Sequence, residues 1–251
     1  INNIFSNHDI NEVLHFAAQS SGEISFDDPE RDLKTNTLST LHLLDASVKH
    51  KVKKFMFAST MSVYGDKEEL VSEKSACNPK SFYGVGKLAS EKYLKIYKNQ
   101  YGLNTTSLRL FNIYGPGQNL ENLRQGMVSI YLAQLLNSNS IEIHGSLERF
   151  RDLVYIDDVT KIVSNLIKMD EFPIDVLNIG TGIKTSVKTI IESLCSALDK
   201  KYENLKIDSD RSTPGDINGI YADNSLLNSL FPNMEFTLFE EGIKIMVDEI
   251  K

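Results

Sequence analysis

The sequence predicts an α/β protein built around a doubly wound parallel sheet, and two observations carry this prediction. Short, nearly continuous apolar runs of strand length occur at 12–18, 53–59 and 106–112. Such runs are typical of strands that are covered on both faces. Segments with apolar residues at helical spacing separate the three runs, and strands that alternate with helices indicate βαβ units and a parallel sheet.

The first predicted helix, at 32–51, precedes the second strand. Its apolar residues recur every three or four positions, as Leu38, Leu41, Leu44 and Val48. A second helix precedes the third strand and carries one apolar stripe, formed by Val85, Leu88, Ala89, Tyr93, Ile96 and Tyr97. Gly102 follows this stripe as a helix stop. Residues 1–8 resemble the tail of a further helix before the first apolar run.

The character of the chain changes after Asn112. The segment 113–126 is rich in Gly, Pro and Asn, which predicts a long loop leaving the sheet. The expected later elements are a helix at 127–137, a strand at 141–145, a strand running into a helix at 151–169, a strand and turn at 176–182, and a helix at 185–198. Asp157 or Asp158 is expected to cap the helix within 151–169, and Thr185 or Ser186 the helix at 185–198.

Composition excludes several classes of function. The net charge of −7 argues against non-specific nucleic-acid binding. No apolar run approaches the roughly 18 residues of a membrane span, so no membrane partner is expected. The two cysteines, Cys77 and Cys195, provide no disulfide framework and indicate a cytoplasmic location. The five histidines lack the spacing of metal ligands, so no metal is expected.

Polar residues follow the predicted strands at the points where the strands end. They are Gln19, Ser20 and Ser21, then Ser59, Thr60 and Ser62, and finally Asn112. In a doubly wound sheet these ends meet at one rim, where ligands bind. Tyr83 and Lys87 begin the helix that leads to the third strand, so they approach the same rim. The other Tyr-x-x-x-Lys pair, Tyr202 and Lys206, has no such surroundings, and we interpret it as chance.

The rim residues suit proton transfer. A free Tyr hydroxyl has a pKa of about 10 and is a poor base at neutral pH. An ammonium group one helical turn away, together with the positive ring of an oxidised nicotinamide, favours the phenolate. Lowering the pKa by about three units requires roughly 4 kcal/mol. Thr60 can orient a substrate alcohol and relay its proton. The alternative is an amphipathic helix whose lysine is merely exposed.

These residues carry a resemblance to a known family. Six segments match, in order: "VLHFAAQSS", "ASTMSVYG", "YGVGK", "RLFNIYGPGQ", "RFRDLVYIDDV" with "NIGTG", and "RSTPGDINGIYAD". The chain therefore resembles the extended short-chain dehydrogenases/reductases, in their NAD-dependent nucleotide-sugar epimerase/dehydratase group. The resemblance covers nearly the whole chain.

The resemblance implies site residues and ligands. The implied catalytic residues are Tyr83, Lys87 and Thr60. The residues implied to bind the cofactor NAD are Phe16, Ala17, Ala18, Gln19, Asn36, Ser59, Tyr83 and Lys87. The residues implied to bind a UDP-sugar are Ser21, Thr60, Ser62, Asn112, Gln125, Gly126, Met127, Val128, Arg151, Arg211 and Asp216. Arg151 matches the diphosphate-binding arginine, whereas Arg211 lies farther from the Pro-Gly-Asp segment than the family pattern has it.

The resemblance also implies a division into two domains. A Rossmann-like dinucleotide-binding domain is expected at 1–114 plus about 152–182. A smaller C-terminal α/β substrate domain is expected at about 115–151 plus 183–251. The family begins with a strand, a Gly-rich turn and a helix that hold the pyrophosphate, and this sequence has no such segment. We therefore expect an N-terminally truncated sheet, lacking roughly 50–60 residues, that binds NAD poorly on its own. Gly180 and Gly182 are expected to form a structural turn rather than a substitute for that segment.

The implied reaction is 4-epimerisation of a UDP-hexose through transient oxidation at C4. Dehydratases of the family place Asp-Glu directly after the hydroxyl residue, where this chain has Met61 and Ser62. The alternatives are another nucleotide-sugar enzyme of the family (a decarboxylase, dehydratase or reductase) or a non-catalytic sugar-nucleotide-binding protein. Helices of this group commonly form a dimeric four-helix bundle, so a homodimer is also expected.

Overall fold

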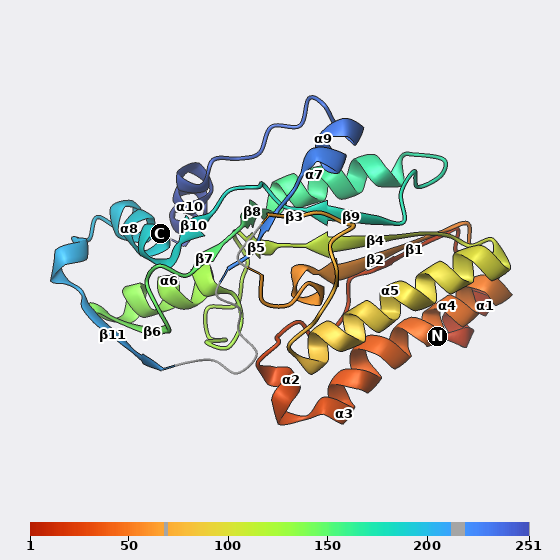
Figure 1. Cartoon of the computed structure of the whole chain (residues 1–251), viewed down its shortest axis with the longest axis horizontal. Helices are drawn as coiled ribbons and strands as arrows, with labels where there is room; N and C mark the ends of the chain where they lie inside the picture. Colours follow the sequence, from red (N-terminus) through yellow and green to blue (C-terminus); the bar gives the residue numbers. More distant parts are fainter. Residues whose placement is uncertain (68–69, 212–218, 251) are drawn as a thin grey trace.

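A parallel four-stranded sheet forms the centre of the protein (Figure 1). The computed structural model describes residues 1–67, 70–211 and 219–250, without the side chains of residue 144 and of 209–211. The strand order is β1-β2-β4-β9, with β1 at Glu12–His15, β2 at Lys54–Thr60, β4 at Asn104–Leu110 and β9 at Val176–Ile179. Each neighbouring pair is parallel. The predicted α/β fold with a parallel sheet is confirmed.

The position of β2 in the sheet explains why its residues 55–58 are all apolar. Phe55 and Phe57 belong to a cluster on one face of the sheet, together with Leu44 and Leu94. Met56 belongs to a second cluster that includes residues of helix α7. Successive side chains of a strand point to opposite faces, so a strand covered on both faces needs apolar residues at every position.

Helices α4 (Ser39–Lys49) and α5 (Phe82–Tyr101) cover one face of the sheet, and α1 (Asn2–Asn7) lies beside them (Figure 1). The Ser81 hydroxyl caps the start of α5 by accepting the Gly84 N–H at 3.1 Å. Gly102 ends α5 in the left-handed conformation, with φ of 70°. The predicted stop at Gly102 is confirmed, because this conformation favours glycine.

The predicted helix at 32–51 is a composite. It is preceded by α2 (Ile24–Asp27), starts with α3 (Pro29–Asp32), continues as the π-helix η1 (Leu33–Leu38) and ends as α4. The Asp28 side chain caps α3 by accepting the Arg31 N–H at 2.9 Å. A π-helical turn is rare and often lies at a functional site.

Helices α7 (Ile156–Ile167) and α9 (Ser225–Leu230) pack on the other face of the sheet. The expected cap of α7 by Asp157 or Asp158 is wrong. Tyr155 occupies the N-cap position without a side-chain hydrogen bond, and both aspartates lie in the first turn. Asp158 is buried and accepts the Thr237 N–H at 2.8 Å. Its carboxylate therefore fixes a distant loop rather than the end of its own helix.

The smaller lobe is built from helices α6 (Met127–Asn137), α8 (Val187–Ala197) and α10 (Phe239–Asp248) around one apolar cluster. Its parallel strand pair joins β6 (Ser140–His144) to β11 (Lys206–Arg211). The expected cap of α8 by Ser186 is confirmed, because its Oγ accepts the Thr189 N–H at 3.0 Å. Tyr202 lies in η3 (Tyr202–Asn204) and Lys206 begins β11, so the second Tyr-x-x-x-Lys pair does not share a helix.

Short elements connect the two lobes. The parallel pair β5–β8 joins Asn112–Tyr114 to Leu153–Tyr155, and the antiparallel pair β7–β10 joins Phe150–Arg151 to Thr185–Ser186. The pair β3–β12 joins Leu70–Val71 to Tyr221–Ala222, and η2 spans Met61–Val63. The predicted domain division stays a proposal. One departure from it is visible, because β12 and α9, assigned to the smaller domain, pack in the apolar cluster of the sheet.

Candidate active site

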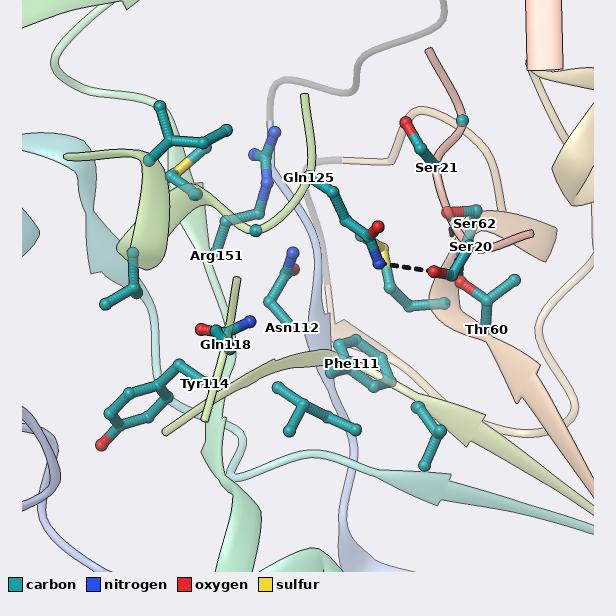
Figure 2. Close-up of a pocket in the computed structure, with 18 of the residues that line it drawn as sticks. Ser20, Ser21, Thr60, Ser62, Phe111, Asn112, Tyr114, Gln118, Gln125 and Arg151 are labelled. Atoms are coloured by element: carbon teal, nitrogen blue, oxygen red, sulfur yellow. Dashed lines mark hydrogen bonds between the residues drawn. The ribbon is translucent and has the colours of Figure 1, made fainter. Parts of the chain in front are cut away.

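A cavity of about 790 Å³ lies where the carboxyl ends of the strands meet the smaller lobe. The ends of β2 and β4, the start of α5, the long loop 115–126, the start of α6 and strand β7 all contribute to its lining. Figure 2 shows Asn112, Gln118 and Arg151 on one side, and Thr60 and Ser62 on the other. The cavity thus occupies the rim at which the polar strand ends were expected to meet.

The three predicted catalytic residues come together in this cavity. Thr60, Tyr83 and Lys87 all line it, and the Thr60 hydroxyl is near enough to Tyr83 to lower the pKa of the phenol. Thr60 ends β2 and accepts the Ser62 N–H at 3.2 Å, which fixes the threonine beside the start of η2. The Ser81 cap positions the first turn of α5, which carries Tyr83. The phenol and the threonine alcohol therefore face one cavity.

Lys87 is held beneath the rim by contacts with β2. Its Nζ donates to the Ala58 carbonyl at 2.8 Å and lies 4.7 Å from the centroid of the Phe57 ring. The same Nζ is 5.8 Å from the centroid of the Tyr83 ring. Burial lowers the pKa of Lys87 to about 8. The ammonium group therefore titrates close to neutral pH.

The phenol of Tyr83 is less acidic than the Tyr-Lys spacing predicts. Burial raises the pKa of Tyr83 to about 12, although the nearby Thr60 hydroxyl acts in the opposite direction. Removing a phenolate from water costs free energy that Lys87 and Thr60 do not offset by themselves. An acidic phenol at this position requires a further positive charge inside the cavity.

A buried polar network supports Ser59, which also lines the cavity. The Ser59 hydroxyl donates to Glu91 Oε1 at 2.5 Å, and Arg109 donates to both oxygens of Glu91, at 2.9 and 2.7 Å. Arg109 also donates to the Tyr64 hydroxyl at 2.9 Å. Because the Ser59 proton is committed to Glu91, the hydroxyl presents only lone pairs to the cavity.

Sequence reasoning missed Glu91 and Arg109, although a signal for them was present. Arg109 lies inside an apolar run that was assigned to a covered strand. A charge in such a strand needs a buried partner. Glu91, one turn after Lys87 on α5, is that partner.

The loop after β1 has a divided role. Of the expected cofactor-binding residues in this loop, Phe16 and Ala18 line the cavity, whereas Ala17 and Gln19 do not. Asn36, which lies in η1, is also not among the lining residues. The Gln19 N–H donates to Asn36 Oδ1 at 2.9 Å, and Gln19 Nε2 donates to Asp32 Oδ1 at 2.8 Å. Gln19 and Asn36 therefore stabilise the conformation of the loop through hydrogen bonds and do not line the cavity.

Most of the expected substrate-binding residues also line the cavity. They are Ser21, Thr60, Ser62, Asn112, Gln125, Gly126, Met127, Val128 and Arg151. Arg151 is buried, and its Nη1 donates to the Phe150 carbonyl at 2.7 Å. Of the remaining two, Arg211 ends β11, but its side chain is not among those that the structure describes, and Asp216 lies outside the described residues.

Two buried amide oxygens in the cavity wall have no hydrogen-bond partner among the described residues. They are Asn112 Oδ1 and Gln118 Oε1. A buried acceptor without a partner is costly, and such groups often await a ligand. Asn112 was expected from the sequence, whereas Gln118 was not, because a lone Gln in a loop carries no distinctive signal.

The long loop 115–126 is tied across the cavity to the segment after β1. Arg124 pairs with Glu23 at 2.9 Å and with Asp27 at 2.7 Å. The Ser21 hydroxyl donates to the Arg124 carbonyl at 3.1 Å, and Gln125 Nε2 donates to Ser20 Oγ (Figure 2). We call these four contacts the Arg124 bridge.

The turn 180–182 has a structural role, as expected. The Asp152 carboxylate accepts the N–H groups of Thr181 and Gly182 at 2.8 and 2.9 Å. It also accepts the Ala222 N–H at 2.9 Å. The turn therefore wraps around a carboxylate of this chain, and its N–H groups are not free to hold a phosphate.

Comparison with known proteins identifies the family. The model of the "NAD dependent epimerase/dehydratase family" matches residues 1–180. The chain belongs to this family. The cofactor of the family is NAD, and the resemblance inferred from the six segments is confirmed. The chain is also 34% identical over 245 residues to a protein named putative UDP-glucose 4-epimerase from Methanocaldococcus jannaschii, covering 97% of this chain and 78% of that relative.

Solved structures of the family share this fold. A UDP-glucose 4-epimerase from Thermotoga maritima, solved with UDP-glucose, superimposes with a TM-score of 0.90 at 35% identity, covering 99% of this chain and 80% of that one. A UDP-glucose 4-epimerase from Thermus thermophilus, in complex with NAD, gives a TM-score of 0.89 at 29% identity, covering 98% and 79%. The Rossmann-like α/β assignment is therefore confirmed.

Other relatives carry names of different reactions. A protein from Escherichia coli named dTDP-4-dehydro-6-deoxyglucose reductase is 30% identical over 202 residues, which is 80% of this chain and 63% of that relative. Membership of the family thus leaves the reaction open. No group of three His, Cys, Asp or Glu side chains in the described part of the chain could hold a metal ion. No helix among the described residues combines the length and apolarity needed to cross a bilayer.

Proposed function

We propose that this chain is an NAD-dependent UDP-hexose 4-epimerase that oxidises C4 of the sugar transiently. The observation that carries the proposal is that Thr60, Tyr83 and Lys87 all line one cavity of about 790 Å³, with Lys87 one helical turn from Tyr83. A cavity of this size is typical of small-molecule sites. The unpartnered oxygens of Asn112 and Gln118 in its wall suit a ligand rich in hydroxyl groups.

The residues beside the rim fit a nicotinamide. Phe16 and Ala18 offer apolar surface, and the Ser59 hydroxyl, whose proton is donated to Glu91, offers lone pairs to an amide N–H. Tyr83 and Lys87 would lie against the same group. When bound, NAD supplies a hydride acceptor that later returns the hydride to the sugar.

The side chains of the rim divide the proton chemistry among them. Tyr83 takes the proton from the 4′-hydroxyl of the sugar as general base and returns it at the end of the reaction. Thr60, which lines the same cavity, holds this hydroxyl and relays its proton toward the phenol. Lys87 contributes positive charge beneath the ring of Tyr83. Burial of all three keeps competing water from the reacting atoms.

The residues after Thr60 favour epimerisation over dehydration. Met61 is buried in the apolar cluster of the sheet, and Ser62 accepts a hydrogen bond from Thr60 at 3.2 Å. Neither residue has a carboxyl group that could remove a proton from carbon and protonate a leaving hydroxyl. A reductase remains the second candidate, because a relative carries that name and reduction needs the same Tyr, Thr and Lys.

The proposal is tested by incubating the purified protein with UDP-glucose and NAD and separating the products by anion-exchange chromatography. Formation of UDP-galactose supports it, and Tyr83→Phe serves as the inactive control. Loss of one water from the sugar would identify a dehydratase. NADH-dependent reduction of a 4-keto sugar, without epimerisation, would identify a reductase. Saturable binding of UDP-glucose without any conversion, at NAD concentrations shown by titration to saturate the protein, would identify a binding protein.

We also propose that the protein is a cytoplasmic homodimer. The location rests on Cys77 and Cys195, both of which are free thiols. The dimer rests on α5, which exposes the apolar side chains Phe82, Val85, Ile96 and Tyr101. Light scattering of Val85→Glu/Ile96→Glu should show a monomer if α5 forms the interface. Ile183→Glu, which is equally exposed and lies in the other lobe, should leave the dimer intact.

A further inference from the structure

Asp32 is a buried carboxylate next to the proposed catalytic residues that the mechanism has not used. It ends α3 and is 2% exposed. Its Oδ1 accepts two hydrogen bonds, from Gln19 Nε2 at 2.8 Å and from Asn36 Nδ2 at 2.9 Å. Two amide donors on one oxygen fix the carboxylate and turn the other oxygen, Oδ2, away from them.

The second oxygen of Asp32 faces the helix that carries Lys87. A Cβ placed on Gly86 would lie 3.7 Å from Asp32 Oδ2 and 2.8 Å from Thr37 Oγ1. The absence of a side chain at Gly86 therefore allows α3 and η1 to approach α5 closely. Lys87 is the next residue along α5, so its ammonium group lies within electrostatic range of the Asp32 carboxylate.

The other titratable groups around Lys87 do not supply a negative charge. On β1, burial lowers the pKa of His15 to about 4, so the imidazole is neutral. On α5, Glu91 is engaged by Arg109, and Tyr83 is a neutral phenol in the free protein. On β2, Lys87 meets only the Ala58 carbonyl and the Phe57 ring.

We propose that Asp32 is a positioning residue of the active site, whose carboxylate, held by Gln19 and Asn36, is the counter-charge that keeps the buried Lys87 in its ammonium form. Burial and Asp32 act on Lys87 in opposite directions. Burial lowers the pKa of Lys87, the negative charge of Asp32 raises it, and the net result of the two is a pKa of about 8. Gln19 belongs to the loop that lines the cofactor side of the cavity, so Asp32 also couples that loop to the lysine.

The inference rests on the proposed role of Lys87, but the charge coupling can be measured without turnover. The protein is labelled with ¹³C at lysine Cε, the Lys87 signal is assigned with Lys87→Met, and its pKa is measured by NMR. In Asp32→Asn the carbonyl oxygen still accepts from Gln19, while the negative charge is lost. We expect the pKa of Lys87 to fall by about one unit, a tenfold change in its proton dissociation constant.

Asp28→Asn is the matched control. It removes the same charge four residues away, and asparagine caps a helix as well as aspartate does. The pKa of Lys87 should not change in this variant. An unchanged Lys87 pKa in folded Asp32→Asn, or equal shifts in both variants, would overturn the proposal.

A reciprocal experiment keeps the proposal testable if Asp32→Asn does not fold. In Lys87→Met the pKa of Asp32, followed through its ¹³Cγ signal, should rise, because two coupled groups shift each other equally. An unchanged Asp32 pKa contradicts the coupling. Where turnover is observed, both limbs of the pH profile of Asp32→Asn should move to lower pH, since Asp32 raises the pKa of Tyr83 as well as that of Lys87. Absence of turnover would count against the proposed function alone.

Discussion

The two walls of the cavity are built in different ways. On the wall formed by β2 and α5, Thr60 is paired with Ser62, Lys87 with the Ala58 carbonyl and Ser59 with Glu91, and Tyr83 is buried beside them. On the opposite wall, Asn112 and Gln118 each leave a buried oxygen without a described partner. The loop of that wall also exposes Leu123 and the ion pairs of Arg124.

This difference assigns proton transfer to the first wall and ligand recognition to the second. Proton transfer needs atoms held at fixed distances before the substrate arrives, and a fully paired buried network provides that rigidity. Binding a bulky nucleotide sugar requires groups that are still free to form hydrogen bonds, and a loop that can move aside. We therefore expect substitutions on the first wall to abolish turnover or folding, and substitutions on the second to weaken binding.

The largest effect is expected from Tyr83→Phe. Removing the general base should lower kcat by about a thousandfold, whereas the affinity for UDP-glucose should hardly change. Steady-state kinetics and calorimetric titration measure the two quantities. Tyr202→Phe, in the chance Tyr-x-x-x-Lys pair, should behave as the unmodified protein. Equal loss of activity in both variants would contradict the assignment of Tyr83, and not Tyr202, as the general base.

The next effect concerns stability on the first wall. Glu91→Gln leaves the buried guanidinium of Arg109 without its carboxylate partner and should lower the free energy of unfolding by about 3–5 kcal/mol. Asp175→Asn breaks a surface ion pair, in which Lys98 Nζ lies 2.6 Å from Asp175 Oδ1. This variant should lower the free energy of unfolding by at most about 1 kcal/mol. Urea unfolding followed by far-UV circular dichroism measures both, since the chain has no Trp. Similar losses of unfolding free energy in the two variants would show that burial of the Glu91–Arg109 pair does not increase its contribution to stability.

On the second wall, Asn112→Ala should separate binding from folding. Its Oδ1 has no partner among the described residues, so the midpoint of thermal unfolding should stay nearly constant. The dissociation constant for UDP-glucose should rise about tenfold, because one ligand hydrogen bond is lost. Asn178→Ala is the control, for which we expect the opposite combination of effects on stability and affinity. Its amide is bonded to Tyr64 and Val71, so this variant should lose stability and retain affinity.

The smallest effect is expected from the Arg124 bridge. Arg124→Ala removes two exposed ion pairs, which contribute little because water screens them. UDP-glucose should dissociate a few-fold faster in stopped-flow measurements, and the difference should shrink at high salt because exposed charges are screened. Lys34→Ala, which breaks an exposed pair with Glu30 that does not involve the loop, should not alter the rate. A dissociation rate that changes neither with Arg124→Ala nor with salt would show that the Arg124 bridge does not retain UDP-glucose in the cavity.

Local patterns were sufficient for the framework of the protein. Apolar runs predicted β1, β2 and β4, helical spacing predicted α5, and Gly102 predicted its end. The same patterns brought Thr60, Tyr83 and Lys87 to one rim, because the carboxyl ends of parallel strands must lie on the same edge. These features depend on neighbours within a few residues, which the sequence displays directly.

Only the tertiary structure decided the charge partners. Asp158 binds Thr237 instead of capping its own helix, Arg109 pairs with Glu91, and Asp32 approaches α5 at Gly86, beside Lys87. The high pKa of Tyr83 belongs to the same class, since it follows from burial. The physical reason is that desolvation and pairing depend on atoms that are brought together by packing from distant parts of the chain, whereas periodicity records only which face of an element is covered.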